Sequence, residues 1–366
     1  MASKQVLLCG YYGYGNGGDE ALLSTLLQML PPSVIPVVMS ATPAKTAQDY
    51  GVVTCNRNDP LAVMRALIQA DAFIWGGGSL IQDVTSWASP LFYLGWMGIA
   101  QLLGRTTLAW AQGIGPLNRP ISRAMARWTF SRCSARSTRD RASAHLLDQW
   151  HLDYVLAPDP VWALAGTPPG EGLSCASPQM PRVQVTASEG AAPPCLAVVL
   201  RRHPQLTEDR LDCIIQALGQ IQAQNQAKLL LLPFQRSQDY EIALQIQTRL
   251  PNPSELVMLE DPRRLKGIFQ RIDLVIAMRL HALIMAASEG CRGYALSYDP
   301  KVRQLMEDLH LPGIDLETLP PHPQSLIQDW QQALESPASF DSGIIRDRIE
   351  AAKAHQQLLH QVLGKG

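Results

Sequence analysis

Short apolar runs alternate with longer periodic segments along the first half of the chain. The segments at residues 21–30 and 61–70 have the apolar spacing of helices that lie on a sheet. The runs of strand length are Val6–Cys9, Val34–Met39, Ala72–Trp75, Thr107–Ala111 and Tyr154–Leu156. This alternation predicts a parallel, doubly wound sheet whose ligand-binding loops gather at the carboxyl ends of the strands.

The alternation stops near residue 165, in a stretch rich in Pro, Gly, Ser and Ala, which is typical of a linker or an insertion. It restarts with predicted strands at 196–200, 228–232, 256–259, 273–277 and 294–297, and helices at 206–222, 239–250 and from about 282. We therefore expect an α/β protein with two Rossmann-like doubly wound domains facing across a cleft. The expected boundaries are 1–165, a linker at 166–195, 196–342, and a C-terminal helix at 343–366.

The amino-acid composition is consistent with two hydrophobic cores and excludes few classes of function. The chain has 366 residues, 46% of them hydrophobic, with 31 basic and 32 acidic side chains. This balance gives no sign of a nucleic-acid partner, so any anion site must be local. Seven scattered cysteines without metal-ligand spacing favour a reducing cytoplasm and no structural zinc, and the sequence suggests no metal ligands for the site.

Two segments bear on membrane targeting. The N-terminal MASKQVLLCG has too short an apolar run for a secretory signal. Residues 90–103 are about fourteen apolar positions where a span needs about twenty, which favours a buried helix. The alternative is a lipid-facing patch formed by Trp87, Phe92, Tyr93 and Trp96.

The stretch GYYGYGNGGDEA, at residues 10–21, contains the pattern GxGxxG between a predicted strand and a predicted helix. The second strand ends in VVMSATP, without the acidic residue that a dinucleotide site would place there. Asp19 and Glu20 would repel a phosphate, although helix capping also explains them. We therefore favour a sugar site with Tyr14, Asn16 and Asp19 as candidates, Asp19 being the candidate base.

Two more glycine clusters, WGGGSLIQD at 75–83 and QGIGP at 112–116, follow strands in the same half. They add Gly77, Gly78 and Gln112 to the candidate sugar site. Tight packing between strand and helix is the alternative explanation.

Positive charge lies at strand ends of the second half. Arg201 and Arg202 follow a predicted strand, and Arg279 with His281 interrupts the apolar segment DLVIAMRLHALIM. A buried charge is costly unless it is compensated, either by a ligand or by an acid such as Glu289 or Glu260. Solvent exposure is the alternative for either Arg201 or Arg202.

Lys301, after the strand YALS, and Arg139, in STRD, complete the set of cations. Several arginines, one lysine and one histidine suit a small, multiply charged anion such as a phosphorylated acid.

These pieces together resemble the polysaccharide pyruvyl transferase family, in particular its CsaB-like members. The matching segments are GYYGYGNGGDEA, WGGGSLIQD, AQGIGP, STRD, APDP, VVLRR, AMRLHALIMAA and SYDPKV. The resemblance implies a GT-B-like fold, phosphoenolpyruvate as donor, a sugar hydroxyl pair as acceptor and a pyruvate ketal as product. That chemistry requires no redox cofactor, and the sequence does not call for magnesium. The acceptor is often a lipid-linked cell-wall or capsule precursor, so we expect a cytoplasmic protein, with peripheral association at the inner membrane face as a further option.

The resemblance assigns the donor site to Arg201, Arg279 and His281, with Lys301 and Arg139 as further candidates. Arg201 is preferred to Arg202 by its strand position. His281 is the candidate acid because an imidazole has a pKa near neutrality. The insertion at about residues 167–194 departs from the family pattern.

Three alternatives stay open on the sequence alone. A nucleotide-sugar glycosyltransferase of the same fold would need a pocket for base and ribose, for which no signature stands out. An NAD-dependent oxidoreductase would need the missing strand-end acid. A sugar-binding protein without activity would leave Arg279 and His281 without a role.

Overall fold

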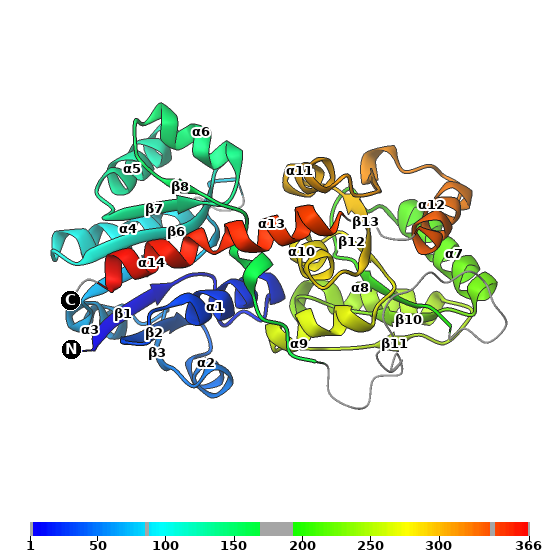
Figure 1. Cartoon of the computed structure of the whole chain (residues 1–366), viewed down its shortest axis with the longest axis horizontal. Helices are drawn as coiled ribbons and strands as arrows, with labels where there is room; N and C mark the ends of the chain where they lie inside the picture. The colour runs from blue at the N-terminus through cyan, green and yellow to red at the C-terminus, as the bar shows by residue number, and fades with distance from the viewer. Residues whose placement is uncertain (1–2, 85–87, 169–192, 337–340, 365–366) are drawn as a thin grey trace. The chain divides into compact units, whose positions relative to one another are not determined.

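The computed structural model describes residues 3–84, 88–168, 193–336 and 341–364, and divides into two compact units (Figure 1). Unit 1 comprises residues 1–164 and 348–366, and unit 2 comprises residues 165–347. The predicted linker at 166–195 lies for the most part outside the described residues.

Unit 1 contains an eight-stranded parallel sheet in the order β3-β2-β1-β4-β6-β7-β8, with β5 paired to β6. Its strands are β1 (Lys4–Cys9), β2 (Val34–Ser40), β3 (Val53–Asn56), β4 (Ala72–Trp75), β5 (Gly78–Ile81), β6 (Thr106–Ile114), β7 (Ala135–Thr138) and β8 (Val155–Leu156). The predicted strands are all present, whereas β3, β5 and β7 were not predicted.

Helices cover both faces of this sheet because successive strand residues point to opposite sides. Val6 and Leu8 face a core with α1 and α14, whereas Leu7 and Cys9 face a core with α3, α4, α5 and α6. The helices of unit 1 are α1 (Gly17–Met29), α2 (Pro43–Tyr50), α3 (Pro60–Gln69), α4 (Ala88–Leu102), α5 (Pro120–Ser131), α6 (Arg141–Gln149) and α14 (Ala354–Leu363).

Unit 2 contains a six-stranded parallel sheet in the order β11-β10-β9-β12-β13-β14. Its strands are β9 (Cys195–Val199), β10 (Lys228–Leu231), β11 (Glu255–Leu256), β12 (Leu274–Ala277), β13 (Arg292–Ser297) and β14 (Gly313–Asp315). The helices are α7 (Glu208–Asn225), α8 (Arg236–Arg249), α9 (Pro262–Gly267), α10 (Leu280–Ser288), α11 (Pro300–Leu309) and α12 (Gln324–Glu335), and α13 (Ser342–Ala352) crosses the boundary between the units. The predicted restart of the alternation is therefore present.

The C-terminal segment is two helices, α13 and α14, rather than the single predicted helix, and it returns the chain to unit 1. The His355 imidazole is fully buried between the Ser137 hydroxyl, at 2.9 Å, and the Pro158 carbonyl oxygen, at 3.0 Å. Burial lowers the pKa of His355 to about 4, so the ring is neutral at pH 7. The last helix is thus part of the core of unit 1.

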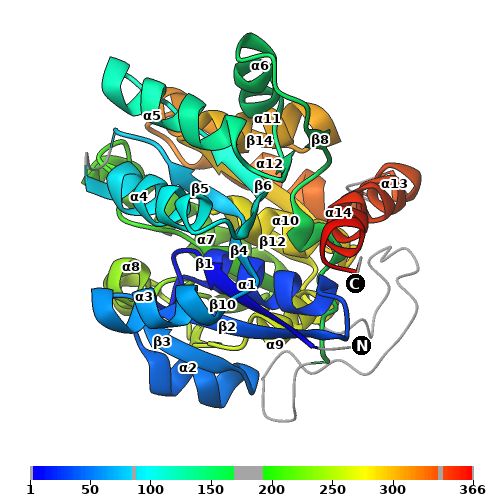
Figure 2. The ribbon, with the colours of Figure 1, turned by 90° about the vertical axis from the view of Figure 1, so that its left-hand side faces the viewer.

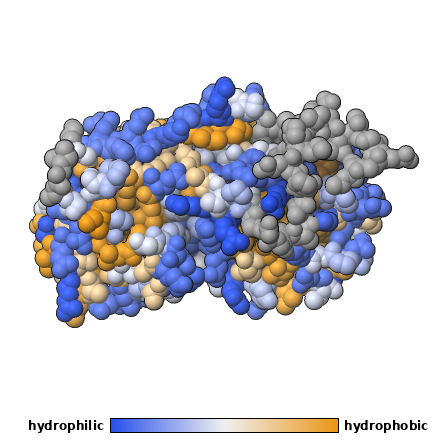
Figure 3. Space-filling view, turned by 60° about the horizontal axis from the view of Figure 1, so that its bottom comes forward, coloured by the Kyte–Doolittle hydropathy of each residue, from blue (hydrophilic) through white to orange (hydrophobic). Residues whose placement is uncertain are grey.

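Helix α4 confirms the expectation of a packed helix at residues 90–103. Its Tyr93, Leu94 and Met97 are buried, whereas Leu102 at its end is 80% exposed. Among the described residues, no helix combines the length and the apolar character that crossing a membrane would take. On the face drawn in Figure 3, hydrophobic residues form separate patches among hydrophilic ones.

Candidate functional site

The glycine loop between β1 and α1 is fixed by side chains of its own helix. Glu20, which is buried, accepts hydrogen bonds from the Gly13 amide at 2.9 Å and the Tyr50 hydroxyl at 3.1 Å. Burial raises the pKa of this carboxyl group. Gly13 has φ of 80°, and a Cβ there would lie 2.2 Å from Ser40 Oγ, so only glycine fits. Glu20 and Gly13 therefore give the loop its shape.

Asn16 caps α1, because its Oδ1 accepts a hydrogen bond from the Gly18 amide at 3.1 Å. The predicted sugar contact of Asn16 would have to share this side chain with the cap. Asp19, in the first turn of the helix, is half-buried.

The three tyrosines of the loop have different positions. Tyr12 is fully buried, and a Cβ at Gly10 or Gly76 would overlap its ring or hydroxyl. Tyr11 and Tyr14 stack on each other with 4.2 Å between ring centroids, and Tyr14 is 39% exposed. Part of the Tyr14 ring is therefore open to solvent. An exposed aromatic ring is the kind of surface against which a sugar ring packs.

Arg57, which the sequence did not single out, lies among aromatic rings next to this loop. Its guanidinium carbon is 5.2 Å from the Tyr14 ring centroid and 4.7 Å from that of Phe92. It donates to the Gly10 carbonyl oxygen at 2.7 Å. This buried cation holds the start of the loop through cation–π and hydrogen-bond contacts.

The second glycine cluster lies beside Asp19. A Cβ at Gly78 would meet the Asp19 carboxylate at 3.5 Å, whereas one at Gly77 would meet Leu22 at 2.9 Å. Gln112, paired with Gly78 across β5 and β6, is fully buried and donates to the carbonyl oxygens of Trp75 and Trp110. The structure thus brings four of the predicted residues together at the carboxyl ends of the unit 1 strands, which we call the sheet edge of unit 1: Asp19, Gly77, Gly78 and Gln112. The side-chain amide of Gln112 is already hydrogen-bonded to backbone carbonyl oxygens.

Arg139 belongs to this same edge in unit 1. It lies directly after β7, forms a buried ion pair with Asp159 at 2.5 Å, and donates to Ser79 Oγ at 3.2 Å. Of the cations predicted for the donor, it is the one in unit 1; Arg201, Arg279, His281 and Lys301 are in unit 2.

Arg279 lies at the end of β12 and pairs with Asp239 of α8. Its Nη2 and Nε donate to the two carboxylate oxygens at 2.5 and 3.2 Å, and Asp239 is 0% exposed. The amides of Phe234 and Gln235 donate to the same carboxylate at 3.1 and 2.9 Å. The acid that compensates Arg279 is therefore Asp239, not the expected Glu289 or Glu260.

Arg201 lies at the end of the neighbouring strand β9 and contacts neutral groups. It donates to the Tyr298 hydroxyl at 3.2 Å and to Gln238 Oε1 at 2.8 Å. Among the described residues, no carboxylate pairs with it. Arg202 is exposed and pairs with Glu241 at 3.3 Å. The structure therefore favours Arg201 over Arg202 as the residue able to receive an anion.

Gln238 and Asp239 are adjacent on α8, so a single helical turn holds both Arg201 and Arg279. Tyr298, after β13, contacts Arg201 and also packs against His203, with 4.4 Å between the centroids of the two tilted rings. Burial, together with the nearby Arg201 charge, lowers the pKa of His203. Three neighbouring strands thus bring two arginines and an aromatic side chain together.

His281 and Lys301 lie in the first turns of α10 and α11, which follow β12 and β13. Both side chains are half-buried; His281 follows the same strand end as Arg279, and Lys301 follows the end of the neighbouring strand β13. Helix N-termini carry partial positive charge, so this edge of the unit 2 sheet favours an anion. In the described part of the chain, no group of three or more His, Cys, Asp or Glu side chains could hold a metal ion.

Comparison with known families decides the class of the protein. The family model for polysaccharide pyruvyl transferases matches residues 16–300. The chain belongs to the polysaccharide pyruvyl transferase family. As members of a transferase family that pyruvylates polysaccharides, proteins of this kind act on a sugar acceptor. The match ends one residue before Lys301 and begins two residues after Tyr14, and it includes the other candidate residues.

Solved structures confirm the α/β fold of this pyruvyl transferase, with the two Rossmann-like domains of the GT-B type. One is UDP-GlcNAc 2-epimerase from Methanocaldococcus jannaschii (TM-score 0.63, 9% identity, 98% of this chain and 99% of that one). Another is Anabaena Alr3699/HepE in complex with UDP-glucose (TM-score 0.61, 14% identity, 99% and 100%). At these identities the likeness shows the fold alone. A search of curated protein sequences finds no significant match.

Replacing Arg279 by Ala should destabilise unit 2 by about 3–5 kcal/mol, because it leaves the buried Asp239 carboxylate without its cation. The matched control is Arg202→Ala, which removes an exposed ion pair and should cost less than about 1 kcal/mol. Chemical denaturation of wild type and both variants measures the difference. Equal losses in the two variants would contradict the structural role of the Asp239 pair.

Proposed function

We propose that this pyruvyl transferase moves the pyruvyl group of phosphoenolpyruvate onto two hydroxyls of a sugar in a cell-wall or capsule polysaccharide precursor. The products are a cyclic pyruvate ketal and inorganic phosphate. The observation that carries the proposal is the pair Arg201 and Arg279, held by the adjacent residues Gln238 and Asp239 at neighbouring strand ends.

The donor suits this pair because phosphoenolpyruvate carries a carboxylate and a phosphate. Arginine forks bind either group bidentately, and lysine supplies a point charge. Because Asp239 already neutralises Arg279, Arg201 would supply the uncompensated charge. We assign Arg201, Arg279 and Lys301 to the donor, and keep Arg139 as a further candidate.

The chemistry requires a proton at the methylene carbon of the donor. We assign this proton to His281, which leaves a cationic centre at the carbon that bears the carboxylate. One sugar hydroxyl attacks that carbon and loses its proton, the carbon–oxygen bond to phosphate breaks, and the second hydroxyl attacks and loses its proton. The arginines would balance the charge of the leaving phosphate.

The acceptor would contact the sheet edge of unit 1. Asp19 is the base we propose for the acceptor hydroxyl, beside Gly77 and Gly78, and Tyr14 would stack on the sugar. Asn16 and Gln112 would contribute only through groups not engaged in their internal hydrogen bonds. A lipid-linked acceptor, met at the cytoplasmic face of the membrane, belongs to the same proposal.

No metal or redox cofactor takes part in the reaction we propose, since proton transfer and charge balance are supplied by side chains. A nucleotide-sugar glycosyltransferase is the second candidate, because the Alr3699/HepE structure of similar fold was solved with UDP-glucose. The two functions differ in their donor, which makes donor binding the deciding test.

Phosphoenolpyruvate should raise the melting temperature of the wild-type protein, since a ligand at a hundred times its Kd adds about 2.7 kcal/mol. Arg201→Ala should abolish the shift, whereas Arg202→Ala, its exposed neighbour, should keep it. Thermal unfolding with phosphoenolpyruvate, phosphate, UDP and NADH measures this. Stabilisation by UDP but not phosphoenolpyruvate would favour the glycosyltransferase, and stabilisation by NADH the oxidoreductase.

His281→Ala should keep phosphoenolpyruvate binding but lower turnover by about 10² to 10⁴-fold, since it removes a general acid. The readout is phosphate release from phosphoenolpyruvate with a lipid-linked sugar precursor, beside the same thermal shift. His322→Ala, at an exposed position, is the matched control. A His281→Ala variant that loses donor binding and turnover together would contradict the assigned role.

A further inference from the structure

Residues 84–139 contain no acidic side chain but seven arginines: Arg105, Arg119, Arg123, Arg127, Arg132, Arg136 and Arg139. This local excess is hidden in the balanced charge of the whole chain. Some of these arginines are used inside unit 1: Arg139 pairs with Asp159, and Arg136 donates to four backbone carbonyl oxygens. The remaining charge is concentrated on α5.

Helix α5 carries this charge on its solvent side. Arg119, Arg123 and Arg127 follow at intervals of four residues, so they form one row, and all are exposed. Arg132 follows the helix, with its guanidinium carbon 4.1 Å from the Trp128 ring centroid. In the described residues, no carboxylate forms an ion pair with Arg123, Arg127 or Arg132.

Exposed apolar side chains lie on another side of α5, because Ile121 is two residues from Arg123 and does not face it, whereas Ile121 and Trp128 are seven apart and share a side. Ile121 is 67% exposed and Trp128 is 42% exposed. A Cβ at Gly98 of α4 would lie 3.5 Å from the Trp128 ring, and Leu102 follows Gly98 by one helical turn. Figure 2 shows α4 and α5 side by side, in agreement with their packing contacts. Ile121, Trp128 and Leu102 therefore form an exposed apolar flank next to the row of arginines.

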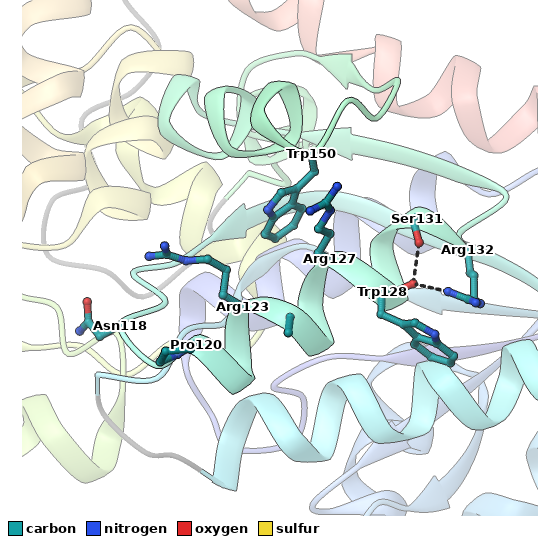
Figure 4. A pocket seen from close by; sticks show the side chains of 9 residues that line it. Asn118, Pro120, Arg123, Arg127, Trp128, Ser131, Arg132 and Trp150 are labelled. Carbon is teal, nitrogen blue, oxygen red and sulfur yellow. Dashed lines mark hydrogen bonds between the residues drawn. The ribbon is translucent and has the colours of Figure 1, made fainter.

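The surface is hollowed around α5. A shallow pocket of about 670 Å³ is lined by Arg123, Arg127, Trp128, Arg132 and Trp150, among others. In Figure 4, Arg127 lies beside the indole of Trp150, while Trp128 points toward α4. Trp150 is only 7% exposed, so the exposed side chains here are the arginines, Trp128 and the aliphatic Ile121 and Leu102. Exposed arginines next to a tryptophan and aliphatic side chains have the composition of surfaces that lie at the interface of a bilayer.

We propose that this face of α5, with the end of α4, docks on a bilayer that contains anionic phospholipid. The arginines would contact lipid phosphates, and Trp128, Ile121 and Leu102 would enter the headgroup region. Charge complementarity selects anionic lipid, and the exposed apolar groups favour a bilayer over a nucleic acid. This inference extends the proposed function, in which the acceptor is lipid-linked, and it rests on that function for its biological meaning.

Vesicle cosedimentation without donor or acceptor tests the docking by itself. Wild type should bind phosphatidylcholine vesicles that contain phosphatidylglycerol and not those of phosphatidylcholine alone. The double variant Arg123→Glu/Arg127→Glu should lose at least about 25-fold in partitioning, since each basic residue contributes about fivefold. Arg65→Glu/Arg346→Glu, a matched control at exposed arginines on α3 and α13, should bind like wild type.

A second variant tests the apolar contact, and its result stays informative even if the double arginine variant does not fold. Anionic vesicles should shift the tryptophan emission of wild type to the blue, and Trp128→Phe should lose most of that shift while still binding. Binding that survives the double variant, falls equally in the control, or is absent in wild type would overturn the proposal. Preference for single-stranded RNA over anionic vesicles would also overturn it. Failure of vesicle binding with intact phosphoenolpyruvate binding would leave the donor assignment standing.

Discussion

The ion pair between Asp239 and Arg279 organises the candidate donor site. The Asp239 carboxylate is fully buried and accepts four hydrogen bonds, two from backbone amides before α8 and two from Arg279. These bonds join the loop after β10 to the loop after β12. A buried carboxylate is tolerated only when its charge is compensated, so this pair fixes the orientation of Arg279. Gln238, the preceding residue, accepts a single hydrogen bond from Arg201 and leaves its charge uncompensated.

In unit 1 the corresponding constraint is the buried ring of Tyr12. Gly10 and Gly76 leave the space that this ring occupies, and Gly13 adopts a backbone conformation that Glu20 stabilises. Several of the glycines are therefore explained by packing rather than by a ligand. The packing nevertheless places Gly78 beside Asp19, so the same arrangement that fills the core also shapes the candidate acceptor edge.

Much of the fold was predictable because its buried strands are continuous apolar runs. The strands β3 and β7 escaped prediction since VTCN and ARST mix polar with apolar residues, and β5 since it begins in a glycine cluster. Arg279, His281 and Arg201 were predictable as cations next to strand ends. Asp239 was not, because it lies 40 residues from Arg279 and the pattern of α8 resembles that of a solvent-exposed helix. Arg57 and Tyr298 were missed for the same reason: their contacts depend on tertiary structure.

The most direct test of the account is a crystal structure of the protein with phosphoenolpyruvate bound. We expect density for the phosphate or the carboxylate within hydrogen-bond distance of the Arg201 and Arg279 guanidinium groups, with the Asp239 pair intact. Density for the donor elsewhere, with Arg201 still bound only to Tyr298 and Gln238, would contradict the assignment of the donor site to this sheet edge of unit 2.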